Sequence, residues 1–281
     1  MSVRRPVVAG AFYPAQPERL RKQIESCFNH ERGPGRLPGR VRTPRNIVSV
    51  VCPHAGYEYS GPAAAHSYLA LAEQEKPDTV IVLGPNHTGW GTPVSMMAEG
   101  SWETPLGRVP LDANLAKAIF NSSDVIDIDE TAFMKEHSME VQLPFLQYIY
   151  GEFKLVPICM GYQDLETSRE VGEAIHKAAE GKNVVILAST DLTHQETQQS
   201  ANVKDRMIID AVLSMDEERL QRVVHENRLT TCGYGPVSAA LVASKLRGAK
   251  AAELLSYYTS GDIIGDYSGV VGYAAVKIIE Q

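Results

Sequence analysis

The sequence predicts an α/β fold, a three-layer sandwich in which a mixed, largely parallel sheet is covered by helices on both faces. Short runs rich in β-branched residues alternate along the 281 residues with longer stretches of helical spacing. These runs are apolar throughout, which is typical of parallel strands buried on both faces. Folds of this class form single domains at lengths of about 200–250 residues, so we expect one domain over residues 1–281.

Each predicted strand is a short β-branched run bounded by glycine, proline or polar residues. Val184–Ser189 is the most strand-like of these runs. Pro157 lies inside another run and predicts a bulge or an edge position, because proline cannot donate to a ladder. A hairpin is expected from Val94–Ala98 and Trp102–Val109. The other predicted strands, of which the last two are expected to pair antiparallel, are Ile47–Cys52, Thr79–Leu83, Lys154–Cys159, Ala252–Tyr258 and Val270–Ile278.

Helices are expected where apolar residues recur at spacings of three and four. Pro62 suits the first turn of a helix over Ala63–Leu71, and Pro144 predicts an irregular start to a helix that ends near Tyr150. The other predicted helices are Pro17–Phe28, Ala113–Phe120, Leu165–Ala179, Asn202–Leu213, Glu217–Glu226 and one from Gly235 to about Lys245. Residues 1–15 predict an ordered extended arm. Residues 30–45, rich in arginine, proline and glycine, predict a mobile and dispensable loop.

The composition excludes several classes of function. The net charge is -7, so we expect neither nucleic acid nor an anionic membrane surface as a partner. No apolar run approaches the ~18 residues that span a bilayer, and the first residues lack a secretory h-region. The four cysteines are widely spaced, which favours reduced thiols in a cytoplasmic protein.

Four chemically active side chains follow the ends of predicted strands. His54, His87 and the pair Asp191 and His194 each come just after a different strand. Ligands of open α/β sheets bind outside the carboxyl ends of the strands, so we expect these side chains to converge. Two histidines with an anionic third ligand suit a divalent first-row metal ion.

The third ligand has two candidates. Asp191 would give two histidines and a carboxylate, whereas Cys232 precedes a predicted helix whose N-terminus would lower the pKa of its thiol. Each also has an ordinary structural explanation, Asp191 as a helix cap and Cys232 as a core thiol. His137 and Glu140 form a further pair that suits a role in supporting the metal ligands, a substrate-facing role or the polar start of a helix.

Several segments, in this order along the chain, resemble the motifs of the Memo family. They are Ala9-Gly-Ala-Phe-Tyr13, Cys52-Pro-His54-Ala-Gly-Tyr57-x-Tyr59-x-Gly61, Gly84-Pro-Asn-His87, Glu136-His-Ser-Met-Glu140, Ser189-Thr-Asp191-Leu-Thr-His194, Cys232-Gly233 and Ser260-Gly-Asp262. Because they cover nearly the whole chain, the sequence is identified as a member of this family, similar to the prokaryotic members of the group called AmmeMemoRadiSam.

The resemblance implies a fold similar to that of class III extradiol dioxygenases, which are non-haem iron enzymes. It places His54, His87 and Cys232 at metal-ligand positions, with Asp191 and His194 in the same pocket. Iron is the implied metal, and copper and zinc are the alternatives. The implied partners are an unidentified small-molecule or peptide substrate and the radical SAM and AMMECR-type proteins of the same system.

We therefore expect a metal-dependent oxidoreductase. His194 would exchange a proton with the substrate or with bound oxygen, and Asp191 would orient His194 or a water molecule. His137, Glu140 and Tyr57 would contact the substrate.

Two rival hypotheses remain at this point. In the first, the chain is a non-catalytic module that keeps the metal pocket and binds a peptide or partner protein. In the second, Cys232 and His194 form the nucleophile and base of a cysteine hydrolase. Metal content and thiol reactivity distinguish the hydrolase from the metal-dependent alternatives.

Overall fold

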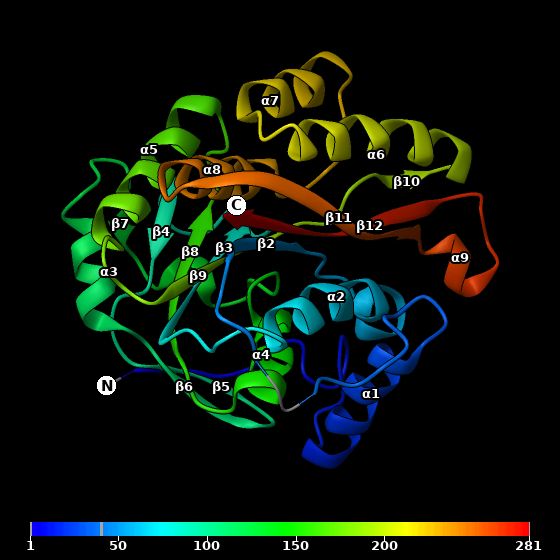
Figure 1. Cartoon of the computed structure of the whole chain (residues 1–281), viewed down its shortest axis with the longest axis horizontal. Coiled ribbons are helices and arrows are strands. Elements are labelled where there is room, and N and C mark those ends of the chain that lie inside the picture. Colours follow the sequence, from blue (N-terminus) through cyan, green and yellow to red (C-terminus); the bar gives the residue numbers. More distant parts are fainter. Residues whose placement is uncertain (1, 40–41, 281) are drawn as a thin grey trace.

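The chain builds a mixed nine-stranded sheet with helices on both faces (Figure 1). The computed structural model describes residues 2–39 and 42–280. The strand order is β10-β12-β2-β9-β3-β8-β4-β7, with β11 also paired to β12. The strands are β2 (Ile47–Cys52), β3 (Thr79–Pro85), β4 (Val94–Met96), β7 (Asp127–Ile128), β8 (Lys154–Met160), β9 (Val184–Ser189), β10 (His194–Glu196), β11 (Ala249–Thr259) and β12 (Val270–Glu280). The four central strands β2, β9, β3 and β8 are parallel, and β12 and β4 flank them antiparallel.

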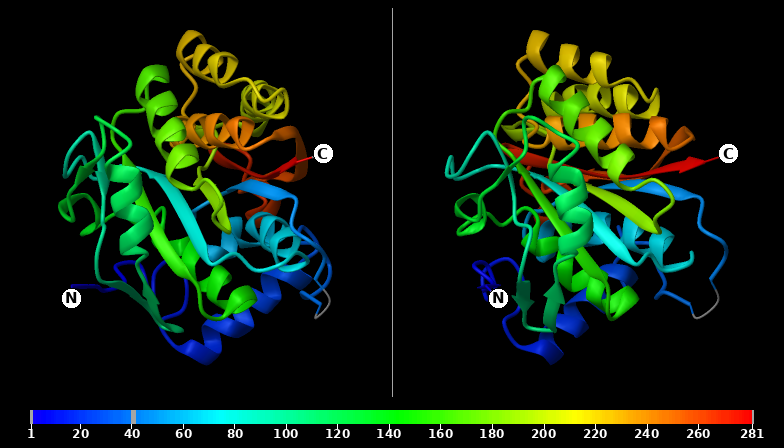
Figure 2. Two further views of the ribbon diagram at one scale, coloured as in Figure 1. Left: turned by 60° about the vertical axis from the view of Figure 1, so that its left-hand side comes forward. Right: turned by 90° about the vertical axis from the view of Figure 1, so that its left-hand side faces the viewer.

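The helices form one layer on each face of this sheet, as the two turned views show (Figure 2). One layer consists of α1 (Pro17–Asn29), α2 (Tyr57–Ala72) and α4 (Leu143–Tyr150). The other consists of α3 (Ala113–Phe120), α5 (Leu165–Ala178), α6 (Gln198–Leu213), α7 (Glu217–Glu226) and α8 (Tyr234–Leu246). The predicted three-layer α/β class is therefore confirmed.

Two separate cores hold these layers together. Along β3, Val80 and Val82 pack toward α1, α2 and α4, whereas Ile81 and Leu83 pack toward the opposite helices. Both sets are fully buried, which explains why the strand sequences are apolar on every residue rather than on alternate ones.

A smaller sheet carries the N-terminal segment. Its strands are β1 (Val3–Arg4), β5 (Ser101–Thr104) and β6 (Gly107–Pro110), of which β1 pairs parallel with β5, and β5 with β6 as a hairpin. Short 3₁₀ turns at Thr131–Phe133 and Glu140–Gln142, and the short α9 (Gly261–Ile264) between β11 and β12, complete the described elements. No helix in residues 2–39 and 42–280 is long and apolar enough to cross a membrane.

Three local predictions are wrong. The second helix starts at Tyr57 rather than Ala63, so Pro62 lies inside the helix rather than in its first turn and has no N–H to donate to the carbonyl four residues before it. The segment from Val94 does not join the hairpin but pairs antiparallel with β8 in the main sheet. Because β4 covers this side of β8, Pro157 lies in an inner strand and not in an edge strand, and its regular pairing with β3 shows no bulge. The residues of β8 paired with β4 end at Ile158, next to Pro157.

The loop over residues 30–45 is tied down in its described part. The Thr43 amide donates to the Glu73 carbonyl, and the Glu75 amide donates to the Thr43 carbonyl, both at 2.8 Å. The Arg42 guanidinium donates to the Ile149 carbonyl at 2.8 Å. The mobility expected of this loop also concerned residues 40 and 41, which lie outside the described residues.

A prediction concerns the close approach of β3 to the segment after Glu136. A Cβ atom on Gly84 would lie 2.6 Å from Ser138 Oγ and 2.7 Å from Met139 Cγ, inside the fully buried core. We expect Gly84→Ala to lower the free energy of unfolding by about 1–3 kcal/mol through overpacking, measured by urea denaturation. Gly39→Ala is the matched control, because a Cβ there meets no atom within 4 Å. Equal stability of the two variants would contradict this packing.

Candidate metal centre

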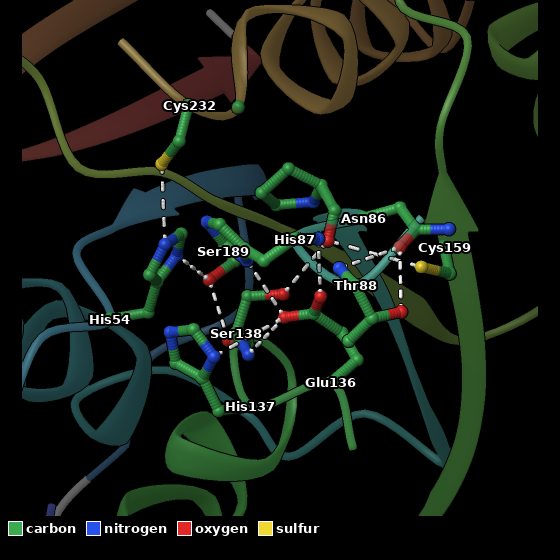
Figure 3. A network of polar contacts seen from close by, with 12 residues as sticks. His54, Asn86, His87, Thr88, Glu136, His137, Ser138, Cys159, Ser189 and Cys232 are labelled. Atoms are coloured by element: carbon green, nitrogen blue, oxygen red, sulfur yellow. Dashed lines mark hydrogen bonds and ion pairs between the residues drawn. The ribbon is translucent and has the colours of Figure 1, made fainter. Parts of the chain in front are cut away.

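The candidate metal centre lies at the carboxyl ends of the parallel strands (Figure 3). His54 follows β2, His87 follows β3, and Cys232 precedes α8. One ligand atom from each of these three side chains lies within 4.8 Å of the others. The structure thus joins both strand-end histidines with Cys232, while Asp191 lies beside the group.

Close backbone contacts bring Cys232 to this position. A Cβ atom on Gly233 would lie 2.4 Å from the Ser189 carbonyl oxygen, so only glycine lets the start of α8 approach the end of β9. Gln163 fixes the same turn, because its Nε2 donates to the Cys232 carbonyl and its Oε1 accepts from the Gly235 amide, both at 2.9 Å. The sulfur is therefore placed by the backbone around it.

Hydrogen bonds behind His54 determine its tautomer. Its Nδ1 lies 2.8 Å from Ser189 Oγ. That hydroxyl donates its one proton to the Ser138 carbonyl (2.7 Å) and accepts from Gln142 Nε2 (2.8 Å). His54 Nδ1 must therefore be the donor to Ser189. Its Nε2 is left unprotonated, 3.2 Å from Cys232 Sγ.

Glu136 holds the His87 ring with its Nδ1 protonated, as Ser189 does for His54. This buried carboxylate accepts from the His87 amide (2.6 Å), from its Nδ1 (2.9 Å) and from the Ser138 amide (2.8 Å). Burial opposes the charge, but the bonds from His87 lower the pKa of Glu136 to about 2. The ionised carboxylate therefore keeps the Nδ1 proton of His87 and leaves Nε2 for a ligand.

Three imidazoles crowd the site, with ring centroids of His54, His87 and His137 between 4.7 and 5.6 Å apart. Burial lowers the pKa of His54 well below its usual value, and the neighbouring rings lower it further. Burial also lowers the pKa of His137. For His87, burial is outweighed by Glu136, which raises the pKa above its usual value. Neutral imidazole, the form that burial favours at His54, is the form that binds a metal ion.

The pKa of the Cys232 thiol is shifted in the direction opposite to the predicted one. Burial, and then the nearby Asp191, raises the pKa of Cys232 well above its usual value. The predicted lowering by the helix N-terminus is wrong, because desolvation outweighs the partial charge of α8. In the protein alone the sulfur keeps its proton. A bound cation would displace that proton. The Asp191 amide, 3.2 Å from Sγ, donates to the sulfur.

Asp191 and His194 lie beside the three candidate ligands. Asp191 Oδ1 accepts from the His54 amide at 2.7 Å, so it supports a ligand rather than His194. Burial raises the pKa of Asp191 to about 6, although the bond from the His54 amide opposes this. His194 Nδ1 lies 2.9 Å from the Thr230 carbonyl, which only accepts, so Nε2 is left free. Gln195, at φ +60°, forms a bulge against β12 directly after His194.

Two residues expected to contact substrate occupy other places. The Glu140 carboxylate is fully buried and accepts from Arg4 (2.8 Å), Tyr13 Oη (2.6 Å) and the amides of residues 7 and 8. Tyr57 is buried, and its hydroxyl donates to the Val141 carbonyl at 2.6 Å. Both side chains are therefore committed to the core. His137 does lie beside His87, with Phe12 packed edge-on against it at 4.9 Å.

Sequence reasoning missed the side chains that stand behind the ligands: Glu136, Gln142 and Ser189. Glu136 directly precedes His137 in a motif already singled out, and Ser189 is the last residue of the clearest predicted strand. A polar residue at the end of an otherwise apolar strand was the available signal, because burying a polar group requires a partner. Gln142 offers no comparable sequence signal.

Known proteins resemble this chain over nearly its whole length. A family described as "Memo-like protein" matches residues 4–277. A MEMO1 family protein of Methanopyrus kandleri is 54% identical over 276 residues, covering 97% of this chain and 98% of the relative. A MEMO1 family protein of Methanothermobacter thermautotrophicus is 50% identical, covering 97% of this chain and 99% of that one.

A solved structure shares the fold. An uncharacterized protein of Escherichia coli K12 superimposes with a TM-score of 0.57 over 83% of this chain and 100% of its own, at 13% identity. At this identity the likeness concerns the fold alone.

A prediction follows from the buried ion pair of Arg4 and Glu140. Removing the guanidinium leaves a carboxylate buried without its charged partner, which costs about 3–5 kcal/mol. We therefore expect Arg4→Ala to lower the urea midpoint strongly. Arg206→Ala breaks an exposed i,i+4 pair with Asp210 and serves as the control, with an expected loss of at most about 0.5 kcal/mol. Equal losses would show that Glu140 is not held as described.

Proposed function

The chain belongs to the Memo family, and from this premise we propose that it is a metal-dependent oxidoreductase whose metal is held by His54, His87 and Cys232. The observation that carries the proposal is the common orientation of the two imidazoles. Each is held through its Nδ1 proton by a buried partner, so the Nε2 atom of each is the one available to a metal ion beside the same sulfur.

The donor set fits a first-row transition metal. Imidazole nitrogens and a thiolate suit iron, copper and zinc, and are a poor match for magnesium or calcium, which prefer oxygen. We propose iron, which the resemblance to extradiol dioxygenases supports, with copper and zinc as alternatives. A bound iron would supply Lewis acidity and one-electron chemistry at this position.

The surrounding side chains supply proton transfer and orientation. His194 keeps its Nδ1 proton on the Thr230 carbonyl, so its Nε2 can take a proton from a substrate hydroxyl. Asp191 holds the backbone at His54 and, with a pKa of about 6, changes charge near neutral pH. His137, half-buried beside His87, forms the wall that we propose faces a small-molecule or peptide substrate. Radical SAM and AMMECR-type partners remain a proposal from the resemblance.

The first test is metal content. Protein purified without oxygen and loaded with ferrous iron should bind one equivalent. His54→Ala and His87→Ala should lose most of it, because each removes a ligand atom. Glu136→Gln should weaken binding about 10–100-fold, because it removes the charged partner of His87 Nδ1. Elemental analysis and competition with a chelator measure both effects.

The control for metal content is His176→Ala, a histidine of α5 outside the cluster. It should bind iron as the wild type does. Equal iron in the wild type, His54→Ala and His87→Ala, with the fold retained, would reject the proposed site. Retention of copper or zinc but not iron would reject the iron assignment. Tight iron binding without turnover of any substrate would favour the non-catalytic module.

The second test concerns Cys232. A ligating thiolate is shielded by its metal, so we expect iron to protect Cys232 from alkylation and a chelator to restore the reaction, measured after replacement of Cys27, Cys52 and Cys159. The raised pKa predicts slow alkylation of the metal-free thiol at pH 7, increasing as the pH rises. Fast alkylation in both states would favour the cysteine hydrolase, and identical slow rates would remove Cys232 from the ligand set.

A further inference from the structure

A small apolar cavity lies between the sheet and helices α6, α7 and α8. Its volume is about 20 Å³, and its wall includes Ile208, Ile209, Val212, Leu220, Val237 and Val276. These six side chains are all buried. Folded proteins contain few such voids, since their interiors are close-packed. The presence of this cavity therefore needs an explanation.

The cavity directly adjoins the candidate metal centre. Thr190 and Thr231 form part of its wall and are the sequence neighbours of Asp191 and Cys232. Thr190 Oγ1 is 3.9 Å from Cys232 Sγ. These two threonines therefore connect the wall of the cavity to the sulfur and to Asp191.

The side chains that line the cavity favour an apolar occupant. The volume would admit one water molecule, which needs about 10–15 Å³, but a buried water also needs two to four polar partners. The hydroxyls of Thr190 and Thr231 both donate to the Asp191 carbonyl, at 2.8 and 2.9 Å, and the rest of the wall is almost wholly apolar. Dry apolar cavities of proteins bind small apolar molecules.

We propose that this cavity holds dioxygen next to the sulfur side of the metal centre. Dioxygen is apolar and has two heavy atoms, which matches the wall and the volume. The choice of dioxygen rests on the proposed oxidoreductase function, whereas the affinity for a small apolar molecule rests on the cavity alone. Tyr234 is the half-buried member of the wall, and its ring packs edge-on against the exposed His225 at 5.6 Å. This side leads to solvent.

The experiment uses dissolved dioxygen itself as the probe, in the metal-free full chain. Dioxygen is paramagnetic and speeds the relaxation of nearby methyl groups, which NMR detects under oxygen pressure. We expect a several-fold larger effect on the methyls of Ile208, Val212 and Val237 than on those of Ile175 and Val185, which are also buried but lie outside the cavity. Equal effects on both sets would overturn the proposal.

Two variants change the cavity in opposite directions. Val212→Leu fills it and should reduce the enhancement at Ile208 and Val237, whereas Ile209→Val enlarges it and should increase the enhancement. Ile175→Val removes the same methylene elsewhere in the core and should leave it unchanged. If Val212→Leu fails to fold, Ile209→Val against Ile175→Val still decides, and no difference between them would contradict the proposal.

A kinetic measurement connects the cavity to the site. In iron-loaded protein mixed with air-saturated buffer, Val212→Leu should slow oxidation of the iron several-fold while binding the same amount of iron. An unchanged rate would overturn the assignment of dioxygen to this route. Failure to bind iron would instead reject the proposed function, and the methyl relaxation would still decide whether dioxygen enters the cavity.

Discussion

One buried hydroxyl, that of Ser189, connects the parts from which the site is made. It lies at the end of β9, accepts from His54 beyond β2, and donates to the Ser138 carbonyl in the segment that also carries Glu136. A hydroxyl with a single proton allows only one pattern of donors around it. The orientation of a candidate ligand is therefore settled by the way three segments of the chain meet, and the pattern holds only while all three are in place.

A second buried hub, the Glu140 carboxylate, serves the same segment from the other side. It ties the N-terminal residues Arg4 and Tyr13 to the turn before α4, while Glu136 of the same segment accepts from the amides of His87 and Ser138. Arg4 is held further by the Glu136 carbonyl (2.5 Å) and by Trp102, whose ring lies 4.1 Å from the guanidinium. The N-terminal segment thus supports the candidate metal centre without supplying one of its candidate ligands.

The features that could be predicted from the sequence are those that depend on the local pattern of residues. The central strands and most helices follow from apolar runs, and the strand-end positions of His54 and His87 predicted their convergence. The place of β4 in the sheet was not predictable, because strand partners depend on distant contacts rather than on local pattern. Glu140 and Tyr57 looked like site residues by proximity in sequence. The structure buries both, since a polar side chain can be held by the N-terminal segment as well as by a ligand.

The pairing of β12 with β2 has a consequence for how the chain is made. The segment that carries His194 is anchored on β12, because the Leu192 amide donates to the Gly272 carbonyl and the Gly272 amide to the Thr193 carbonyl, both at 2.9 Å. Domains fold as units during synthesis, and pairings between distant segments form late. Until residues 270–280 have left the ribosome, β2 lacks β12, one of its two neighbours, and the loop of Asp191 and His194 lacks its support. A ribosome-bound chain would consequently carry its histidines without a formed pocket around them.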